Sequence, residues 1–267
     1  MTDSNSMIPW NLVDELGIIV VPLTITIAGI ELTEDRDLDV EGTYIQLRTG
    51  ATVSTSAPSP GSFAVAYAQL AGSPVVSVHI GSNFSATSNA ARLGAAAGGF
   101  DVHVVDSGVA SFMAGCCVLA AARSAGDGNV VDAVIEAAER TAAGVETIFT
   151  LAELDRARAG GRFDGRPLGT NGVPVIRMVG GAFEQIGTAI SDVDAASAMF
   201  DAVVQSSQRL RIGVGGADAG PVVDDLFERL REARPDDEII RYTVGPTVAA
   251  HAGMGTFGIV YHPLDRI

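Results

Sequence analysis

The strongest constraint on the fold is an alternation, through roughly the first 150 residues, of short apolar runs with segments of helical periodicity. Each apolar run is bounded by Gly, Pro or Asp, as buried strands commonly are. The intervening segments place apolar residues on one helical face and close with a glycine. The expected strands span 17–29, 74–81, 100–106 and 145–151, and the expected helices lie within 60–72, 108–126 and 129–144. This alternation predicts an α/β domain with a mainly parallel sheet.

The pattern changes after residue 151, where a polar stretch rich in Gly and Arg interrupts the alternation. Two short apolar runs joined by Gly180 and Gly181 follow, which predicts a β-hairpin. A second series of elements then consists of a helix near 193–208, a strand at 210–216, a helix at 221–233 and strands at 237–245 and 255–262. We therefore expect two α/β domains, residues 1–155 and 156–267, the second with a mixed sheet.

Charge and hydropathy exclude some functions. The chain has 32 acidic and 17 basic residues, and its net charge of -15 repels nucleic acid and anionic lipid surfaces. No apolar run approaches the roughly 20 residues that a membrane span needs, and the start lacks the basic and apolar regions of a secretory signal. We expect a cytoplasmic protein that is not integral to a membrane. One basic cluster, Arg156, Arg158, Arg162 and Arg166, is either a solvated patch or a docking site for a partner protein or an anionic ligand.

Cysteines and histidines give no metal-binding pattern. Cys116 and Cys117 are adjacent in an apolar run, which indicates buried free thiols. The histidines lack a second His or Cys at metal-ligand spacing. His79 and His103 fall in expected strands, where a hydrogen-bonded structural role is favoured. His251 lies in "GPTVAAHAGMGTFG", where Pro246 and the glycines predict a loop rather than a regular helix.

Two common nucleotide signatures are incomplete. "LRIGVGGADAG" combines a strand, a Gly-rich turn and a helix, but Asp218 stands where the dinucleotide fingerprint needs its third glycine. The chain contains no lysine, which excludes a Walker-type phosphate loop. A tight strand-to-helix turn is favoured here, with a nucleotide-binding module as an alternative.

The stretch "TVSTSAPSPGSF", residues 52–63, places several hydroxyls before an expected helix. Pro58 and Pro60 restrict the backbone and favour extended geometry just before them. We expect Ser56 and Ser59 to cap or brace the turn into the helix. The segment is therefore predicted to be stiffer than a linker.

Seven segments occur in the order found in the DegV family. They are "TDS", "LGIIVVPLTITIAG", "TSAPSPGSF", "SVHIGSNFSATSNAARLGA", "VHVVDSGVASFMAG", "AGGRFDG" and "GPTVAAHAGMGTFGIVYH". The sequence resembles this family over essentially its whole length. The resemblance implies two α/β domains with a lipid site between them, binding of a long-chain fatty acid and no other cofactor. It also implies a non-catalytic protein, which in some members is the acyl-carrying subunit of a bacterial fatty acid kinase.

Three residues match the family's carboxylate-binding positions: Thr55 in "TSAPS", Ser85 in "SNFSATS" and His251 in "AAHAGMGTFG". The small residues of 85–99 could let an acyl chain pass close to the backbone, or could mark a close-packed helix–sheet contact. The rival interpretation is a hydrolase of acyl esters or acyl phosphates, with Ser85 as nucleophile and His251 as base.

The sequence also departs from the family pattern. The apolar strand that usually precedes "TDS" is absent, which predicts a truncated start or a first sheet with one strand fewer. "SATSN" replaces "SGTYQ" and "AGGR" replaces "KGGR". These replacements bear on kinase docking and on the preferred acyl chain.

Overall fold

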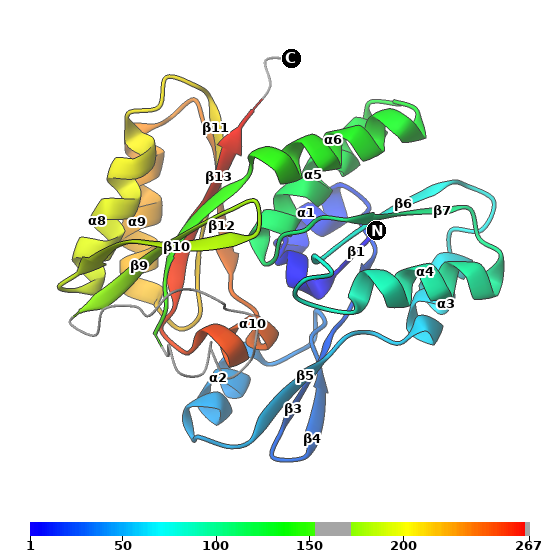
Figure 1. The fold of residues 1–267 in the computed structure, drawn as a ribbon, viewed down its shortest axis with the longest axis horizontal. Helices are drawn as coiled ribbons and strands as arrows, with labels where there is room; N and C mark the ends of the chain where they lie inside the picture. Colours follow the sequence, from blue (N-terminus) through cyan, green and yellow to red (C-terminus); the bar gives the residue numbers. More distant parts are fainter. Residues whose placement is uncertain (153–171, 265–267) are drawn as a thin grey trace. The chain divides into compact units, whose positions relative to one another are not determined.

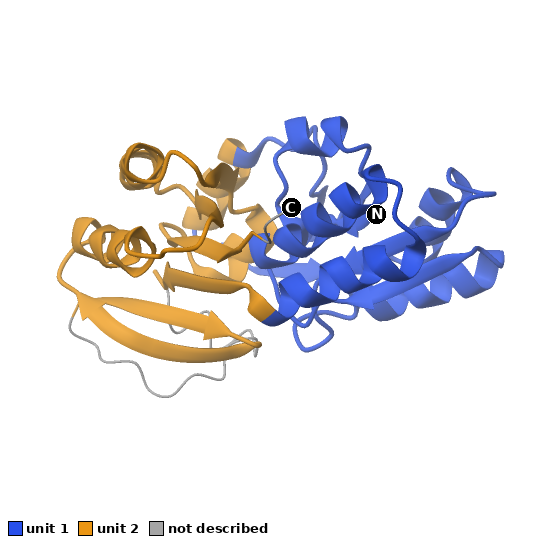
Figure 2. Ribbon diagram, turned by 90° about the horizontal axis from the view of Figure 1, so that it is seen from above, with its two compact units in different colours: residues 1–40, 49–143 blue, residues 41–48, 144–267 orange. Residues whose placement is uncertain are grey.

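The computed structural model describes residues 1–152 and 172–264, and its internal contacts divide the chain into two compact units. Unit 1 comprises residues 1–40 and 49–143, and unit 2 comprises 41–48 and 144–267 (Figure 2). The predicted boundary between residues 155 and 156 and the four-arginine cluster at 156–166 lie outside the described residues.

Unit 1 contains parallel strands with helices on both sides (Figure 1). Its elements are β1 (Thr2–Asp3), η1 (Ser4–Ser6), α1 (Trp10–Glu15), β2 (Val20–Val21), β3 (Thr24–Ile27), β4 (Ile30–Thr33), β5 (Val53–Ser56), α3 (Pro60–Ala68), β6 (Val75–His79), α4 (Thr87–Gly98), β7 (Val102–Asp106), α5 (Phe112–Gly126) and α6 (Val131–Gly144). β1 pairs with β2 and β6 pairs with β7, both in parallel. The Met1 backbone joins the two pairs by donating to the Val76 carbonyl and accepting from the Val78 amide. The predicted mainly parallel sheet is confirmed.

The start of unit 1 differs from expectation in two ways. The first sheet was expected to lack a strand at its start, but Thr2 and Asp3 of "TDS" itself form a two-residue strand, β1, that pairs with β2. The single strand expected over 17–29 is divided into β2 and β3, because Pro22 has no amide hydrogen and the next amide, that of Leu23, donates to the Ser4 hydroxyl. β3 then pairs antiparallel with β4 and β5 in a separate sheet.

Helix packing in unit 1 depends on small residues. A Cβ atom at Gly94 of α4 would lie 2.5 Å from the Pro60 carbonyl oxygen and 2.8 Å from Phe63 Cβ on α3. This part of the 85–99 stretch therefore makes a close helix–helix contact. Cys116 and Cys117 are fully buried free thiols in α5, as predicted, and burial raises the pKa of the Cys117 thiol above its ordinary value.

Unit 2 is built on a six-stranded mixed sheet in the order β10-β9-β8-β13-β11-β12. Its elements are β8 (Glu146–Thr150), β9 (Val173–Val179), β10 (Ala182–Ala189), α8 (Asp192–Val204), β11 (Leu210–Gly216), α9 (Gly220–Ala233), β12 (Glu238–Thr243), α10 (Pro246–Ala252) and β13 (Phe257–Pro263), together with most of α2 (Val40–Arg48). β11 and β12 run parallel, whereas the other neighbours are antiparallel. α8 and α9 pack against β11 and β13 around a shared apolar core. The predicted mixed sheet is confirmed.

Local sequence decides two turns of unit 2. Gly180 and Gly181 have φ angles of 56° and 80°, the conformation that a two-residue hairpin turn requires, so the predicted hairpin is confirmed. Asp218, at the incomplete nucleotide signature, has a φ of 57° and forms an ion pair with Arg48. That carboxylate is therefore engaged by a side chain of the same unit.

The prediction of a loop around His251 was wrong for its first half, because residues 246–252 form the helix α10. Pro246 occupies the first helical position, which proline favours because its missing amide hydrogen has no helical acceptor there. The segment contains no glycine until Gly253, which ends the helix. Among the helices within residues 1–152 and 172–264, none is both long and apolar enough to cross a membrane.

Candidate functional site

Polar side chains gather in unit 1 at the carboxyl ends of β1, β6 and β7. In open α/β sheets the loops that leave these strand ends are where ligands usually bind. The hydroxyl-bearing residues of these loops are Ser4, Ser6, Ser82, Ser85, Ser107 and Ser111. The structure thus brings Ser85 into a region rich in hydrogen-bonding groups.

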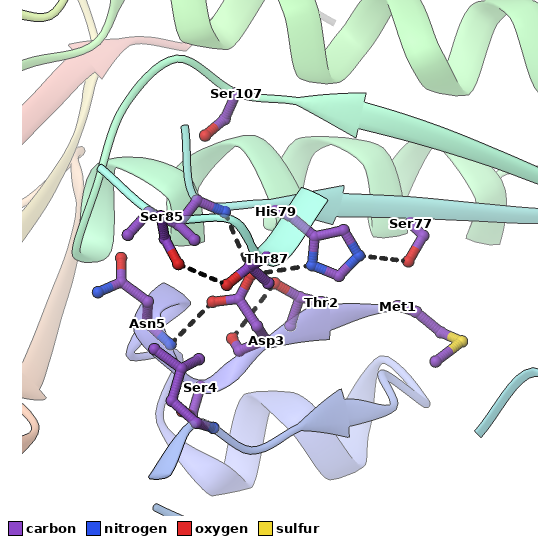
Figure 3. Close-up of polar contacts among 12 residues, drawn as sticks. Met1, Thr2, Asp3, Ser4, Asn5, Ser77, His79, Ser85, Thr87 and Ser107 are labelled. Carbon is purple, nitrogen blue, oxygen red and sulfur yellow. Dashed lines mark hydrogen bonds and ion pairs between the residues drawn. The ribbon is translucent and has the colours of Figure 1, made fainter. Parts of the chain in front are cut away.

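Asp3, the last residue of β1, is fully buried and connects two of these chain segments (Figure 3). Its Oδ1 accepts a hydrogen bond from the Asn5 amide at 3.0 Å. Its Oδ2 accepts the Ile80 amide at 3.1 Å and lies 2.8 Å from His79 Nδ1. A carboxylate buried away from water needs such donors, because it is otherwise costly to desolvate.

A line of buried hydrogen bonds continues from His79. Its Nε2 lies 2.7 Å from the Ser77 hydroxyl, which accepts from the Tyr67 hydroxyl at 3.0 Å. With Tyr67 donating to Ser77, the consistent arrangement has Ser77 donating to Nε2 and Nδ1–H donating to Asp3. Burial raises the pKa of Tyr67, and the contact with Ser77 partly offsets that rise. We call Asp3, His79, Ser77 and Tyr67 the Asp3 network.

The Asp3 network has the order of groups found in Ser-His-Asp hydrolases, but it is enclosed. Ser77 and His79 are both 0% exposed, so a substrate has no access to the hydroxyl. The Phe63 ring packs edge-on against His79, with ring centroids 5.0 Å apart. His79 is therefore the buried, hydrogen-bonded histidine that its strand position predicted.

The loop of residues 80–86, here called the Ser85 loop, packs against the loop that follows β7. The Gly81 amide donates to the Val109 carbonyl at 2.8 Å, and the Gly81 carbonyl accepts from the amides of Phe84 and Ser85. A Cβ atom at residue 81 would lie only 2.6 Å from the carbonyl carbon of Gly108. The close approach of the two backbones requires glycine at this position.

Asp106, at the end of β7, ties the same two loops together. Its Oδ1 accepts the Ser82 amide at 2.9 Å and the Gly108 amide at 3.1 Å. Partial burial acts to raise the pKa of Asp106, but the hydrogen bonds from Ser82 and Gly108 and the charge of Arg92 outweigh it and lower the pKa. The ionised carboxylate is the form that accepts both amides.

Ser85 is half-buried, and its hydroxyl lies 2.8 Å from that of the buried Thr87 (Figure 3). Thr87 is the first residue of α4, and Ala86 provides no side-chain cap for the helix. The first turn of a helix carries amides without helical acceptors and a partial positive charge. Hydroxyls in this position are chemically suited to receive a carboxylate.

Thr55 lies on β5 in unit 1, opposite Ile25 of β3. It is half-buried, whereas Ser54 and Ser56 on either side are exposed. Ser59 caps α3 by accepting the Ser62 amide at 3.1 Å, as predicted. Thr55 is therefore half-buried, whereas the other hydroxyl-bearing residues of 52–63 are exposed.

His251 lies in α10 of unit 2 and is half-buried. Thr55 and Ser85 belong to unit 1, Thr55 on β5 and Ser85 in the loop between β6 and α4. The grouping of the three residues around one carboxylate stays a prediction.

Sequence reasoning missed the role of Asp3, although "TDS" was one of the recognised segments. Ser77 and His79 are two residues apart on a strand, which places both side chains on one face, so their contact could have been anticipated. Their bonds to Tyr67 and Asp3 depend on tertiary packing. Within residues 1–152 and 172–264, no group of three or more His, Cys, Asp and Glu side chains is placed to hold a metal ion.

Comparisons with known proteins cover nearly the whole chain. Residues 1–264 match the sequence model of the DegV family, which is described as an uncharacterised protein. A DegV domain-containing protein of Streptomyces coelicolor is 30% identical over 273 residues, covering 97% of this chain and 96% of the relative.

Solved structures show the same fold. A DegV family protein from Thermus thermophilus, described in terms of its fatty acid binding, superposes with a TM-score of 0.86 at 30% identity and covers 98% of each chain. DegV from Bacillus subtilis, described as a fatty acid binding protein, superposes with a TM-score of 0.88 at 21% identity, again over 98% of each chain. At 21% identity, the similarity to the Bacillus subtilis protein shows the fold alone.

Proposed function

Since the chain belongs to the DegV family, we propose that it binds a long-chain fatty acid, such as palmitate, in a buried tunnel. The carboxylate is held by Thr55, Ser85 and His251. The observation that carries this proposal is the position of the Ser85 hydroxyl, beside Thr87 at the uncapped start of α4. The Thermus thermophilus relative, described as binding fatty acid, supports the same class of ligand.

Hydroxyl and imidazole donors suit a buried carboxylate because they are small and leave room for the acyl chain. Each hydrogen bond to a charged group contributes about 1.5 to 3 kcal/mol. Removing one donor should therefore weaken binding roughly 10- to 150-fold.

The acyl chain supplies the larger gross free energy. Burial of about fourteen methylenes at about 0.8 kcal/mol each gives on the order of 11 kcal/mol before the costs of ordering the ligand. Micromolar or tighter binding is expected.

Native mass spectrometry tests the proposal directly. The protein is delipidated, incubated with palmitate and examined for a one-to-one complex. We expect a complex with palmitate and a much weaker one with hexadecane, which has the same chain length but no carboxylate. A wild-type protein that retains no palmitate would overturn the proposal.

Matched variants test the headgroup residues. Thr55→Val and Ser85→Ala each remove one hydroxyl and should weaken palmitate binding by at least about tenfold. Ser59→Ala is the control, because it removes a nearby hydroxyl that caps α3. Equal palmitate affinity in all three variants would exclude the assigned roles of Thr55 and Ser85.

The same site can present the acid to a fatty acid kinase, with the partner performing phosphoryl transfer. We expect the purified protein to form no acyl phosphate from palmitate and Mg-ATP. Trapping with hydroxylamine, which converts acyl phosphate to a hydroxamate, measures this. Hydroxamate formation by the chain alone would contradict the non-catalytic role.

A further inference from the structure

Three segments of unit 1 meet through the side chains of Asp3 and Asn5. Asp3 Oδ2 accepts the amide of Ile80, the first residue of the Ser85 loop. Asp3 Oδ1 accepts the Asn5 amide, and Asn5 Oδ1 accepts the Ser111 amide at 2.7 Å. The turn after β1, the Ser85 loop and the loop after β7 are thereby joined in one hydrogen-bonded unit.

Ser111 indicates that this connection holds the backbone firmly. Its φ angle is 59°, in a region that a serine rarely adopts. The Ser111 amide is held by Asn5, and its hydroxyl donates to the Met7 sulfur at 3.2 Å. Such a conformation persists only where surrounding contacts determine it.

His79 sets the orientation of the Asp3 carboxylate. Its Nδ1 shares Oδ2 with the Ile80 amide, so the two donors fix the rotation of the carboxylate about its side-chain bond. Its other nitrogen contacts Ser77, on the same strand. The two ring nitrogens therefore have different partners: Nδ1 contacts Asp3, which holds the Ser85 loop, and Nε2 contacts Ser77 within the same strand.

We propose that His79 is a positioning residue for ligand binding, which acts through Asp3 to hold the Ser85 loop in the shape that presents the Ser85 hydroxyl. This inference rests on the proposed role of Ser85 in carboxylate binding. The contact of Nδ1 with Asp3 affects both ligand binding and stability, whereas the contact of Nε2 with Ser77 affects stability alone.

Two substitutions separate the ring nitrogens. The amide of His79→Asn reaches as far as Nδ1 and can still donate to Asp3, whereas that of His79→Gln reaches as far as Nε2. Both delete the ring and its packing against Phe63, so both should lower the melting temperature to a similar extent. Palmitate affinity should stay within about threefold of wild type in His79→Asn and fall by about tenfold or more in His79→Gln. Equal affinity of the two variants would overturn the proposal.

Ser77→Ala is the matched control. It removes the partner of Nε2 and leaves the contact between His79 and Asp3 intact. We expect a lower melting temperature with palmitate affinity within about twofold of wild type. A loss of affinity as large as that of His79→Gln would place the effect in Ser77 and contradict the role of Nδ1.

Amide hydrogen exchange of the lipid-free protein tests positioning without a ligand. The amides of Ile80, Gly81, Phe84 and Ser85, which have hydrogen-bond acceptors, should exchange slowly in the wild type and in His79→Asn, and faster in His79→Gln. If the wild type binds no palmitate, the proposed function fails while this comparison still decides whether His79 holds the loop. If neither variant folds, the wild type decides, because Ile80 exchange as fast as in an unfolded chain would refute an anchored loop.

Discussion

Asp3 in unit 1 and Arg234 in unit 2 are both largely buried charged side chains, and the two charges are satisfied in opposite ways. In unit 1, Asp3 is surrounded by donors: two backbone amides and the Nδ1 of His79. In unit 2, Arg234 is surrounded by acceptors: its guanidinium donates to carbonyls and pairs with Asp237. The carbonyl acceptors belong to Val203, Val204, Ser206 and Gln208.

The difference lies in what each charge holds together. Asp3 joins loops at the carboxyl ends of parallel strands, where the ligand site is proposed. Arg234 joins the end of α9 to the end of α8, whose last carbonyls lack helical partners. A buried charge therefore fixes the shape of loops in unit 1, whereas in unit 2 it fixes the packing of two helices.

The largest expected effect is on Arg234. Arg234→Met keeps much of the side-chain volume but leaves Asp237, whose side chain is 3% exposed, without its cationic partner. Breaking a buried ion pair from one side costs about 3 to 5 kcal/mol of unfolding free energy, measured by urea denaturation. Arg231→Met is the control, because its pair with Glu228 is more than half exposed, and it should cost at most about 1 kcal/mol. A smaller loss in Arg234→Met than in the control would break the comparison.

Asn5→Ala should have the next largest effect, and in both stability and binding. The amide of the half-buried Ser111 loses its acceptor, which costs about 1 to 3 kcal/mol. Amides of the loop after β7 should exchange faster, and palmitate affinity should fall with them. Asn89→Ala, an exposed position of α4, serves as the control for replacing an asparagine. A loss of stability with unchanged exchange would mean that Asn5 does not anchor this loop.

Tyr67→Phe should have a smaller effect. It removes one buried hydrogen bond to Ser77 and retains the ring, so we expect a loss of about 0.5 to 1.5 kcal/mol by thermal or urea denaturation. Because His79 keeps its contact with Asp3, palmitate affinity should not change. A tenfold loss of affinity would mean that the whole Asp3 network, rather than its Asp3 end, sets the Ser85 loop.

The smallest expected effect concerns the ionisation of one tyrosine in each unit, which changes stability only at high pH. Burial raises the pKa of Tyr67 in unit 1, and burial together with the Glu146 carboxylate raises the pKa of Tyr261 in unit 2. Because the folded-state pKa lies above the unfolded value of about 10, each phenol contributes stability that is fully present below that pH. This stability is lost as pH rises through the folded-state pKa.

The ultraviolet absorbance of tyrosinate, followed as the pH is raised above about 10, measures the ionisation of these two tyrosines. Glu146→Gln should lower the pKa of Tyr261 by removing the adjacent negative charge, and should leave that of Tyr67 unchanged. An unchanged titration in Glu146→Gln would show that burial alone raises the pKa of Tyr261.

Most elements of the fold were predictable because they depend on local patterns. The apolar runs at 74–81 and 100–106 became β6 and β7, and the Gly-Gly hairpin became β9 and β10. α10 was missed because proline was interpreted as a helix breaker, whereas at the first helical position it favours a helix. The division of 17–29 was missed because a single proline within a long apolar run decides it.

The sequence by itself determined the alternation of strands and helices, the buried thiols, the family and the three residues expected to hold a carboxylate. The elements and the buried thiols follow from periodicity and composition, whereas the family and the three residues follow from the resemblance in the order of short segments. Only the tertiary structure placed Asp3 against His79, which lies 76 residues further along the chain. It also joined Asn5 to Ser111 across 106 residues. Such contacts arise because parallel strands bring distant strand ends to one edge of a sheet, and no local pattern encodes which side chains then meet.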